Sequence, residues 1–257
     1  MYATGVDATE RLSELVGTLR RDGRIDVAAA AAEFGTAELT IRRDLDLLVA
    51  RGVARRVRGG AVNLLMRGEA LPFAMRELEA VDSKRRIAAA VAALISDGEA
   101  VGLDSGTTVV ETARALTGRR LTVMPMSLHA AMALAGSPSI RLMLPGGETR
   151  AGELAMVGPM ALAGIAALRF DTVVLGCCGV SPEGQMMAHD LGDAAVKLAL
   201  LASARRSVLA LDGAKFGRAA LAVVCELAAV DVVVTDGSAP DSAAAALEAA
   251  GVEVHRV

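Results

Sequence analysis

The stretch that decides the fold of this chain is Thr40-Ile41-Arg42-Arg43-Asp44-Leu45, followed within twenty residues by Arg55-Arg56-Val57-Arg58-Gly59-Gly60-Ala61. The first segment predicts an amphipathic helix, because Ile41, Leu45 and Leu48 recur at helical spacing and share one face. The arginines between them then lie on the exposed face. The second segment predicts a basic hairpin, since its glycine pair allows the chain to turn sharply.

A helix with exposed arginines beside a basic hairpin is suited to duplex DNA. The helix can lie in the major groove, where its side chains contact bases or phosphates. The hairpin arginines would contact the DNA backbone or the minor groove. The alternative interpretation is a solvated helix face without a partner. The predicted DNA-binding residues are Thr40, Arg42, Arg43, Arg55, Arg56 and Arg58.

Charge is unevenly distributed along the chain. The net charge of the 257 residues is −3. Between Arg42 and Arg58, however, six arginines face two aspartates, which gives a local balance of +4. The local patch matters for phosphate binding more than the total does. Aromatic residues make up only 2% of the chain. This scarcity argues against binding of single-stranded nucleic acid, in which bases stack on aromatic rings.

Three helices and a hairpin are expected at the N-terminus. The segments are a first helix that ends at Asp22-Gly23, helices over Val27–Phe34 and Ala37–Ala50, and a hairpin over Val53–Val62. This order is typical of a winged helix-turn-helix. We therefore expect a DNA-binding domain over residues 1–62 and a connector over residues 63–81.

From residue 82 to residue 257, helical stretches alternate with short apolar runs. The expected strands are Ala100–Leu103, Leu121–Met124, Ile140–Leu144, Thr172–Leu175, Ser207–Leu211, Asp231–Thr235 and Val252–Arg256. Helices are expected over Lys84–Ile95, Thr107–Leu116 and Gly192–Ala204. This alternation predicts an α/β domain with a mostly parallel, Rossmann-like sheet.

Four loops follow strands of this sheet, where open α/β domains bind ligands. They begin at Asp104, Gly146, Gly176 and Asp212. Small and hydroxyl-bearing residues at a helix start offer free N–H groups to an anion, and a lysine from a neighbouring loop can complete such a site. The alternatives are an ordinary helix cap after Asp104 and a surface position for Lys215. Asp193 and Lys197 form either a simple helix-stabilising pair or part of a polar cluster at the ligand.

The chain resembles the DeoR family of bacterial transcriptional regulators. The resemblance lies in the segment from Thr40 to Ala61 quoted above and in Pro72-Phe73, Arg76, Lys84, Asp104 to Thr108, Gly146-Gly147, Asp190, Val196-Lys197 and Asp212 to Phe216. It implies a second domain similar to ribose-5-phosphate isomerases that senses a phosphorylated sugar or related metabolite. It also implies a homo-oligomeric repressor that the effector releases from DNA. The effector-binding residues expected by position are Asp104, Ser105, Gly106, Thr107, Thr108, Gly146, Gly147, Asp190, Lys197, Asp212 and Lys215.

Three positions depart from the family pattern. Thr36-Ala37 replaces the usual Val-Ser before the recognition helix, so Thr36 is expected to cap that helix one residue early. Pro125-Met126 replaces a Thr-Asn pair before Ser127, which removes two polar groups from the expected pocket edge. Ala214 replaces a serine before Lys215. These changes indicate either an effector with fewer hydroxyl groups than the usual one or a pocket with altered chemistry.

The sequence as a whole predicts a DNA-binding regulator of carbohydrate or related metabolism, not an enzyme. The alternative is a sugar-phosphate isomerase with an accessory DNA-binding domain, which would require a carboxylate base and an acid partner. Scattered histidines and cysteines predict no metal site, and no cofactor is expected. No segment is apolar enough to span a membrane, so a cytoplasmic location is expected.

Overall fold

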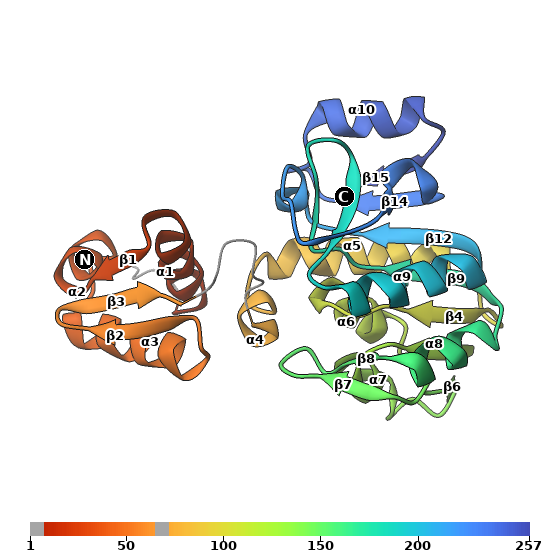
Figure 1. Ribbon diagram of the computed structural model, residues 1–257, viewed down its shortest axis with the longest axis horizontal. Coiled ribbons are helices and arrows are strands. Elements are labelled where there is room, and N and C mark those ends of the chain that lie inside the picture. The colour runs from red at the N-terminus through yellow and green to blue at the C-terminus, as the bar shows by residue number, and fades with distance from the viewer. Residues whose placement is uncertain (1–7, 65–71) are drawn as a thin grey trace. The chain divides into compact units, whose positions relative to one another are not determined.

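The computed structural model describes residues 8–64 and 72–257. The chain divides into two compact units, Met1–Glu79 and Ala80–Val257 (Figure 1). Residues 65–71 of the predicted connector lie outside the described residues, as do residues 1–7 of the predicted DNA-binding domain. The described part of the connector contains a short helix, α4 (Phe73–Arg76). In the part of the chain that is described, no helix has the length and apolarity required to cross a membrane.

The first unit contains the predicted helices and hairpin. Its elements are α1 (Ala8–Asp22), β1 (Arg24–Asp26), α2 (Val27–Glu33), α3 (Glu38–Ala50), β2 (Ala54–Val57) and β3 (Gly60–Asn63). Strand β1 was not predicted, and it makes the hairpin a three-stranded sheet of order β1-β3-β2. Its three residues include a single apolar side chain, Ile25, so no alternation signals a strand.

The apolar face of α3 forms the centre of the first unit. Ile41, Leu45 and Leu48 are each fully buried, as the sequence predicts. Arg11 Nε lies 2.6 Å from Asp44 Oδ2 and links α1 to the same helix. The predicted Thr36 cap is wrong: the N-cap residue is Ala37, and no side chain caps α3. The chain enters the helix one residue later than expected, so the hydroxyl of Thr36 is not at the capping position.

The second unit is built on a seven-stranded sheet in the order β15-β14-β12-β9-β4-β5-β6, with every neighbouring pair parallel. Its strands are β4 (Ala100–Leu103), β5 (Leu121–Pro125), β6 (Ile140–Leu142), β9 (Phe170–Leu175), β12 (Ala204–Ala210), β14 (Val232–Thr235) and β15 (Glu253–Arg256). These are the seven predicted strands, and the domain is Rossmann-like as expected. The strand order reverses between β4 and β9, where open α/β sheets bind ligands.

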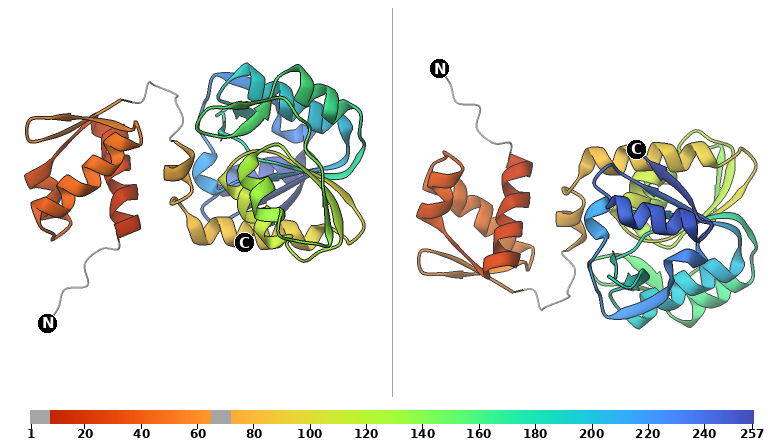
Figure 2. Two further views of the ribbon diagram at one scale, coloured as in Figure 1. Left: turned by 90° about the horizontal axis from the view of Figure 1, so that it is seen from below. Right: turned by 90° about the horizontal axis from the view of Figure 1, so that it is seen from above.

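Helices cover both faces of this sheet (Figure 2). They are α5 (Val81–Leu94), α6 (Thr107–Ala115), α7 (Leu128–Leu134), α8 (Pro159–Ala166), α9 (Leu191–Ser203) and α10 (Asp241–Ala249). Helices α5, α6 and α7 pack side by side on one face, and α8 packs against α9 on the other. Central strand residues such as Val173, Leu209 and Val233 are therefore buried, and buried and exposed side chains do not alternate along these strands.

Short strands that were not predicted complete the domain. Two form the hairpin β7 (Glu148–Arg150) and β8 (Ala155–Val157), and three form a small sheet of β10 (Gly179–Val180), β11 (Gln185–Ala188) and β13 (Ala222–Glu226). Hairpin β7–β8 is attached to the end of β5, because Met156 N donates to Met126 O at 2.8 Å. Strands β7, β8 and β10 have only two or three residues each, too few to give a periodic pattern.

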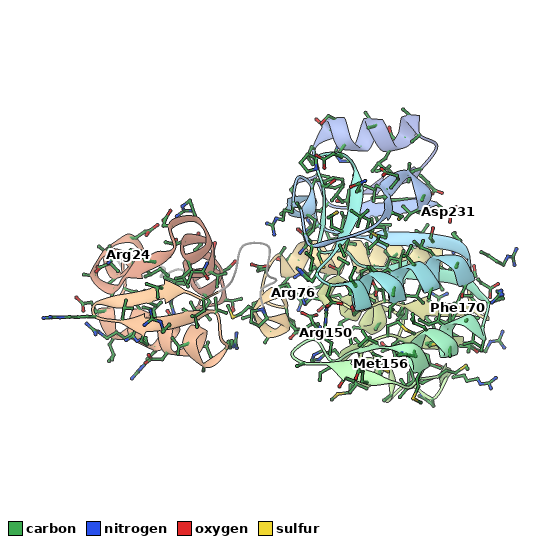
Figure 3. The ribbon with its side chains drawn as sticks, in the orientation of Figure 1. Arg24, Arg76, Arg150, Met156, Phe170 and Asp231 are labelled. Atoms are coloured by element: carbon green, nitrogen blue, oxygen red, sulfur yellow. The ribbon has the colours of Figure 1, made fainter. Side chains whose placement is uncertain are left out.

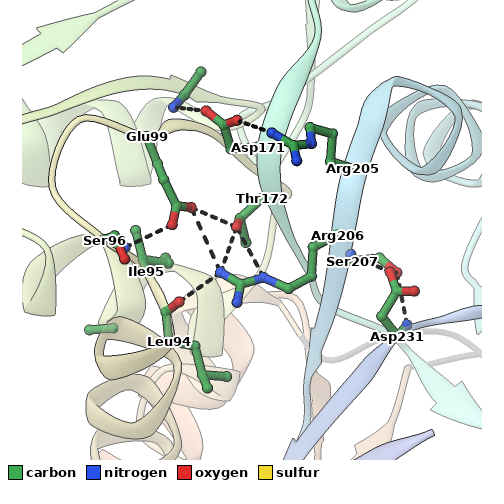
Figure 4. A network of polar contacts seen from close by, with 12 residues as sticks. Leu94, Ile95, Ser96, Glu99, Asp171, Thr172, Arg205, Arg206, Ser207 and Asp231 are labelled. Atoms are coloured by element: carbon green, nitrogen blue, oxygen red, sulfur yellow. Dashed lines mark hydrogen bonds and ion pairs between the residues drawn. The ribbon is translucent and has the colours of Figure 1, made fainter. Parts of the chain in front are cut away.

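A polar network closes the amino edge of the sheet (Figure 4). Arg206 Nη2 donates to Leu94 O at 2.6 Å and to Thr172 Oγ1 at 2.8 Å. Thr172 Oγ1 in turn donates to Glu99 Oε2 at 2.7 Å. The network links the end of α5 to β9 and β12. The predicted ligand loops lie at the opposite, carboxyl edge.

Candidate DNA-binding face and effector site

The exposed face of α3 carries the first group of predicted DNA-binding residues. Arg42 and Arg43 are exposed, and Thr40 is half-buried. Arg42 Nη2 lies 2.9 Å from Glu38 Oε2 one helical turn earlier. An exposed pair of this kind contributes little to stability. Both arginines are therefore free to exchange this contact, or solvent, for DNA.

The hairpin β2–β3 carries the second group. Arg55 and Arg58 are exposed, whereas Arg56 Nε is 3.2 Å from Asp46 Oδ1 on α3. Gly59 makes the turn at a φ of +82°. The backbone of β1 approaches Gly60 closely. A Cβ added at Gly60 would lie only 1.8 Å from Ile25 O. Gly59 therefore allows the hairpin to turn, and Gly60 leaves room for β1 to pair with β3.

In the second unit, four adjacent strands bring their carboxyl ends together. The order β12-β9-β4-β5 places Asp212, Gly176, Asp104 and Met126 at neighbouring positions along one sheet edge. Asp104 N donates to Val174 O at 2.9 Å and Met126 N donates to Leu103 O at 2.6 Å, so the sheet remains regular up to these loops. The loop with Gly146 and Gly147 follows β6, one strand further out.

A buried charge cluster lies beneath this edge. Lys197 Nζ contacts Asp104 Oδ2 and lies 3.2 Å from Asp193 Oδ1, and all three side chains are at most 5% exposed. Burial raises the pKa of Asp104 against the attraction of Lys197. Burial opposes the charge of Lys197, but the two carboxylates outweigh it and raise its pKa. The Asp193–Lys197 pair is thus part of a polar cluster and not a simple surface pair.

Asp104 is also fixed from the next strand. Gly176 N donates to Asp104 Oδ2 at 3.0 Å. The other carboxylate oxygen, Oδ1, is buried and has no hydrogen-bond partner among the described residues. A buried acceptor without a donor is costly unless a ligand supplies one.

Helix α6 begins directly beside this cluster. Its N-cap residue, Gly106, has a φ of +117°, and no side chain caps the helix. The loop therefore starts the helix without a side-chain cap, and its role in effector binding stays a prediction. The first N–H groups of the helix remain available, with the hydroxyl-bearing residues Ser105, Thr107 and Thr108 around them. Such a helix start attracts an anion.

The turn after β12 supplies Asp212 and Lys215. Asp212 is buried and Lys215 is half-buried, and within the described residues neither side chain has an ion-pair or hydrogen-bond partner. Cys177, which follows β9, is close to this turn. Burial raises the pKa of the Cys177 thiol to about 12, with a smaller, opposite effect of Lys215 and Lys197. Both lysines thus act electrostatically on Cys177, at the carboxyl edge of the sheet.

Two sequence models match this chain. Residues 11–64 match the DeoR-like helix-turn-helix domain, and residues 79–237 match the DeoR C terminal sensor domain. The chain belongs to the DeoR family. The two units therefore combine a DNA-binding domain with a domain that senses a small-molecule effector, and this DeoR-family protein is a DNA-binding transcriptional regulator.

Relatives with curated names cover nearly the whole chain. The glycerol-3-phosphate regulon repressor of Escherichia coli is 30% identical over 91% of this chain and 93% of its own length. The HTH-type transcriptional repressor CsqR of E. coli is 30% identical over 99% of this chain and 97% of its own length. The solved structure of ribose 5-phosphate isomerase A from Methanocaldococcus jannaschii is 19% identical, with a TM-score of 0.40 over 53% of this chain and 54% of that one.

The remaining predicted residues of this DeoR-family sensor domain have visible structural roles. Asp190 is the N-cap residue of α9, accepts from Asp193 N at 2.8 Å and is ion-paired with Arg150. Gly147 allows close packing, since an added Cβ would lie 2.7 Å from Val157 O. Direct contacts of Asp190, Gly146 and Gly147 with an effector stay predictions.

One departure from the family pattern, the Pro125-Met126 pair, is buried in apolar surroundings. Pro125 and Met126 are buried, and Met126 is fully enclosed by the hydrophobic core. Ser127 keeps a local role, since its Oγ accepts from Ala130 N and caps α7. The end of β5 therefore offers no side-chain polar group before Ser127. A groove of about 480 Å³ lies elsewhere, between α10 and the small sheet, and none of the predicted effector residues lines it.

Proposed function

We propose that this protein is a repressor released from its operator by a phosphorylated, sugar-like effector, and that it is not an enzyme. The observation that carries the proposal is the uncapped start of α6 beside the buried cluster of Asp104, Lys197 and Asp193. A phosphate group fits the free N–H groups of such a helix. The name of the E. coli relative, a glycerol-3-phosphate regulon repressor, supports the same class of effector.

The proposed binding mode divides the effector into two parts. Its phosphate lies at residues 105–108, and Lys215, from the turn after β12, contributes a positive charge at the same edge of the sheet. Its hydroxyl groups donate to the carboxylates of Asp104 and Asp212, of which Asp104 has an unused buried oxygen. The apolar end of β5 at Pro125-Met126 favours a compact effector with few hydroxyl groups on that side.

The alternative of an isomerase is less consistent with this geometry. Asp104 and Asp193 both contact Lys197, and a carboxylate held in an ion pair is a poor general base. An aldose–ketose turnover assay on the full chain with ribose 5-phosphate tests this point. Measurable turnover that disappears in Asp104→Asn would contradict the proposal that the protein only senses its ligand.

On the DNA side, we propose contacts from α3 and from the hairpin arginines of a homo-oligomer. Two copies of a helix-turn-helix unit would bind two half-sites of one operator. Loss of an arginine that contacts guanine costs roughly 1–3 kcal/mol. A protein that acts on operator DNA is expected to work in the cytoplasm.

The test uses an operator recovered from a pool of randomised duplexes by the full chain. Fluorescence anisotropy should show strong binding by the wild type and loss of specific binding by the double variant Arg42→Ala/Arg43→Ala, with unchanged circular dichroism. Glycerol 3-phosphate or glucose 6-phosphate should release the wild-type complex, while glycerol and glucose should not. Unchanged operator affinity in the double variant would show that α3 is not the recognition helix.

A further inference from the structure

Hairpin β7–β8 places an arginine at the candidate effector site. Nothing in the sequence around this arginine predicts that it lies there. Arg150 lies at the end of β7. The hairpin is attached to the loop after β5, since Met156 N donates to Met126 O at 2.8 Å and Leu128 N donates to Leu154 O at 3.0 Å. The hairpin therefore occupies the carboxyl edge of the sheet, near the start of α9 (Figure 3).

The contacts of Arg150 place its guanidinium beside the buried charge cluster. Arg150 Nη1 is ion-paired with Asp190, the N-cap residue of α9. Burial alone would lower the pKa of Arg150, but Asp190, Asp193 and Glu153 outweigh it and raise that pKa. Asp193 also contacts Lys197. One chain of charges thus leads from Arg150 through Asp193 and Lys197 to Asp104, next to the start of α6.

The guanidinium has donors that the protein does not use. Arg150 is only 23% exposed, yet its Nε is buried and has no hydrogen-bond partner among the described residues. A guanidinium carries five N–H donors in a planar fork that matches the oxygens of a phosphate. The Asp190 carboxylate that it contacts is 41% exposed, and an ion pair with an exposed partner stabilises the fold little.

We propose that Arg150 is an effector-binding residue that donates to the phosphate group of the effector. This inference rests on the proposed function. Under this proposal, hairpin β7–β8 lines one side of the site and the start of α6 lines another. The Gly146-Gly147 turn positions β7. Asp190 holds the guanidinium in this structure and competes with the phosphate for the same donors.

The test is isothermal titration calorimetry of the full chain with glycerol 3-phosphate, glucose 6-phosphate and inorganic phosphate. Arg150→Ala should weaken binding of the phosphorylated probe about 10-fold to 100-fold, the range expected for hydrogen bonds to a charged group. Arg150→Lys keeps the charge without the fork and should lose less. Arg205→Ala removes an 81% exposed arginine at the amino edge of the sheet and is the matched control.

Asp190→Asn distinguishes binding from a purely structural role. Asparagine still caps α9. Under this inference Asp190 acts on the effector only through Arg150, so removal of the competing carboxylate should raise the affinity for the phosphorylated probe. If Arg150 only fixed the hairpin to α9, Arg150→Ala and Asp190→Asn would weaken binding alike, and this result would overturn the inference. Unchanged affinity in Arg150→Ala would overturn it as well. If the wild type binds none of the three probes, the proposed function itself fails, and the inference fails with it.

Discussion

At the scale of single residues, Lys197 is the buried cation of the candidate effector site. Its ammonium group lies between Asp104 and Asp193 in a region closed to solvent. Removal of one partner from a buried ion pair leaves an uncompensated charge, which costs far more than the intact pair contributes. The buried cluster therefore links the loop after β4 to α9 beside the candidate site.

We predict that Lys197→Met lowers the free energy of unfolding of the sensor domain by about 3–5 kcal/mol. The two carboxylates would remain buried without their cation. Urea unfolding followed by circular dichroism measures the change, with Arg205→Ala as the control expected to stay within about 0.5 kcal/mol of wild type. A loss below about 1 kcal/mol in Lys197→Met would show that the carboxylates accept protons or solvent at little cost.

The site residues differ in how far the sequence could predict them. Asp104 could be placed from its sequence, because it follows an apolar strand and the carboxyl ends of parallel strands meet. Lys197 was predicted through the family pattern, and its helical spacing from Asp193 left two interpretations open. The sequence does not indicate the role proposed for Arg150, since β7 has only three residues and the partner Asp190 lies 40 positions away. Contacts between distant loops depend on how short strands pack, which no local pattern encodes.

At the scale of elements, the pairing of strand β1 with β3 depends on one glycine, Gly60. Asp26 pairs in register with Gly60 of β3, and Ile25 O occupies the space that a side chain at Gly60 would need. The sequence predicts a turn at Gly59-Gly60 but gives no sign of the crossing strand. Most strands of the seven-stranded sheet could be predicted from a run of apolar residues, such as Val173–Leu175 and Val232–Val234. Strand β1 has one apolar residue and β7 has none, so neither gives such a signal.

We predict that Gly60→Ala destabilises the DNA-binding unit by more than about 1 kcal/mol, since the backbone of β1 must shift. Gly17→Ala is the matched control, because Gly17 lies inside α1 with open space around it. Alanine there should stabilise the helix by about 0.5–1 kcal/mol. Thermal unfolding of the full chain followed by circular dichroism compares the two. Equal effects in both variants would contradict the close approach of β1.

A second connection between elements centres on Asp236, at the end of β14. Its Oδ1 accepts from Gly213 N at 3.1 Å and from Ser238 Oγ at 2.6 Å. Burial tends to raise the pKa of Asp236, but hydrogen bonds from Ser238, Ser83 and Gly213 outweigh it and lower that pKa. The carboxylate therefore joins the turn that carries Lys215 to the first turn of α5.

We predict that Asp236→Asn lowers the stability of the sensor domain at pH 7 by about 1–3 kcal/mol. Because the folded pKa lies below the unfolded one, this contribution is fully present above the unfolded pKa and is lost as pH falls through the folded pKa. The difference between wild type and variant should therefore shrink from pH 6 to about pH 2.5. Urea unfolding at both values measures it, and a difference that grows in acid would contradict the lowered pKa.

At the scale of the whole molecule, the DNA-binding unit and the sensor unit differ in how their charges are distributed. The basic residues of α3 and the hairpin give the DNA-binding unit its local excess of positive charge, although the chain as a whole carries −3. The sensor unit buries Asp104 and Asp193 against Lys197, and the candidate effector site lies at this cluster. An effector can therefore change DNA affinity only through a change of conformation or assembly, since it does not compete for the same cations.

Such a coupling between sites must be reciprocal. If the effector lowers operator affinity by some factor, the operator lowers effector affinity by the same factor, which is typically about 5-fold to 150-fold. We predict this equality for whichever of glycerol 3-phosphate and glucose 6-phosphate binds. Titration calorimetry with and without saturating operator gives one factor, and anisotropy with and without the sugar phosphate gives the other. In Arg42→Ala/Arg43→Ala the duplex should leave effector affinity unchanged. An effector that releases the operator although its own affinity is indifferent to DNA would show that release does not pass through the sensor site.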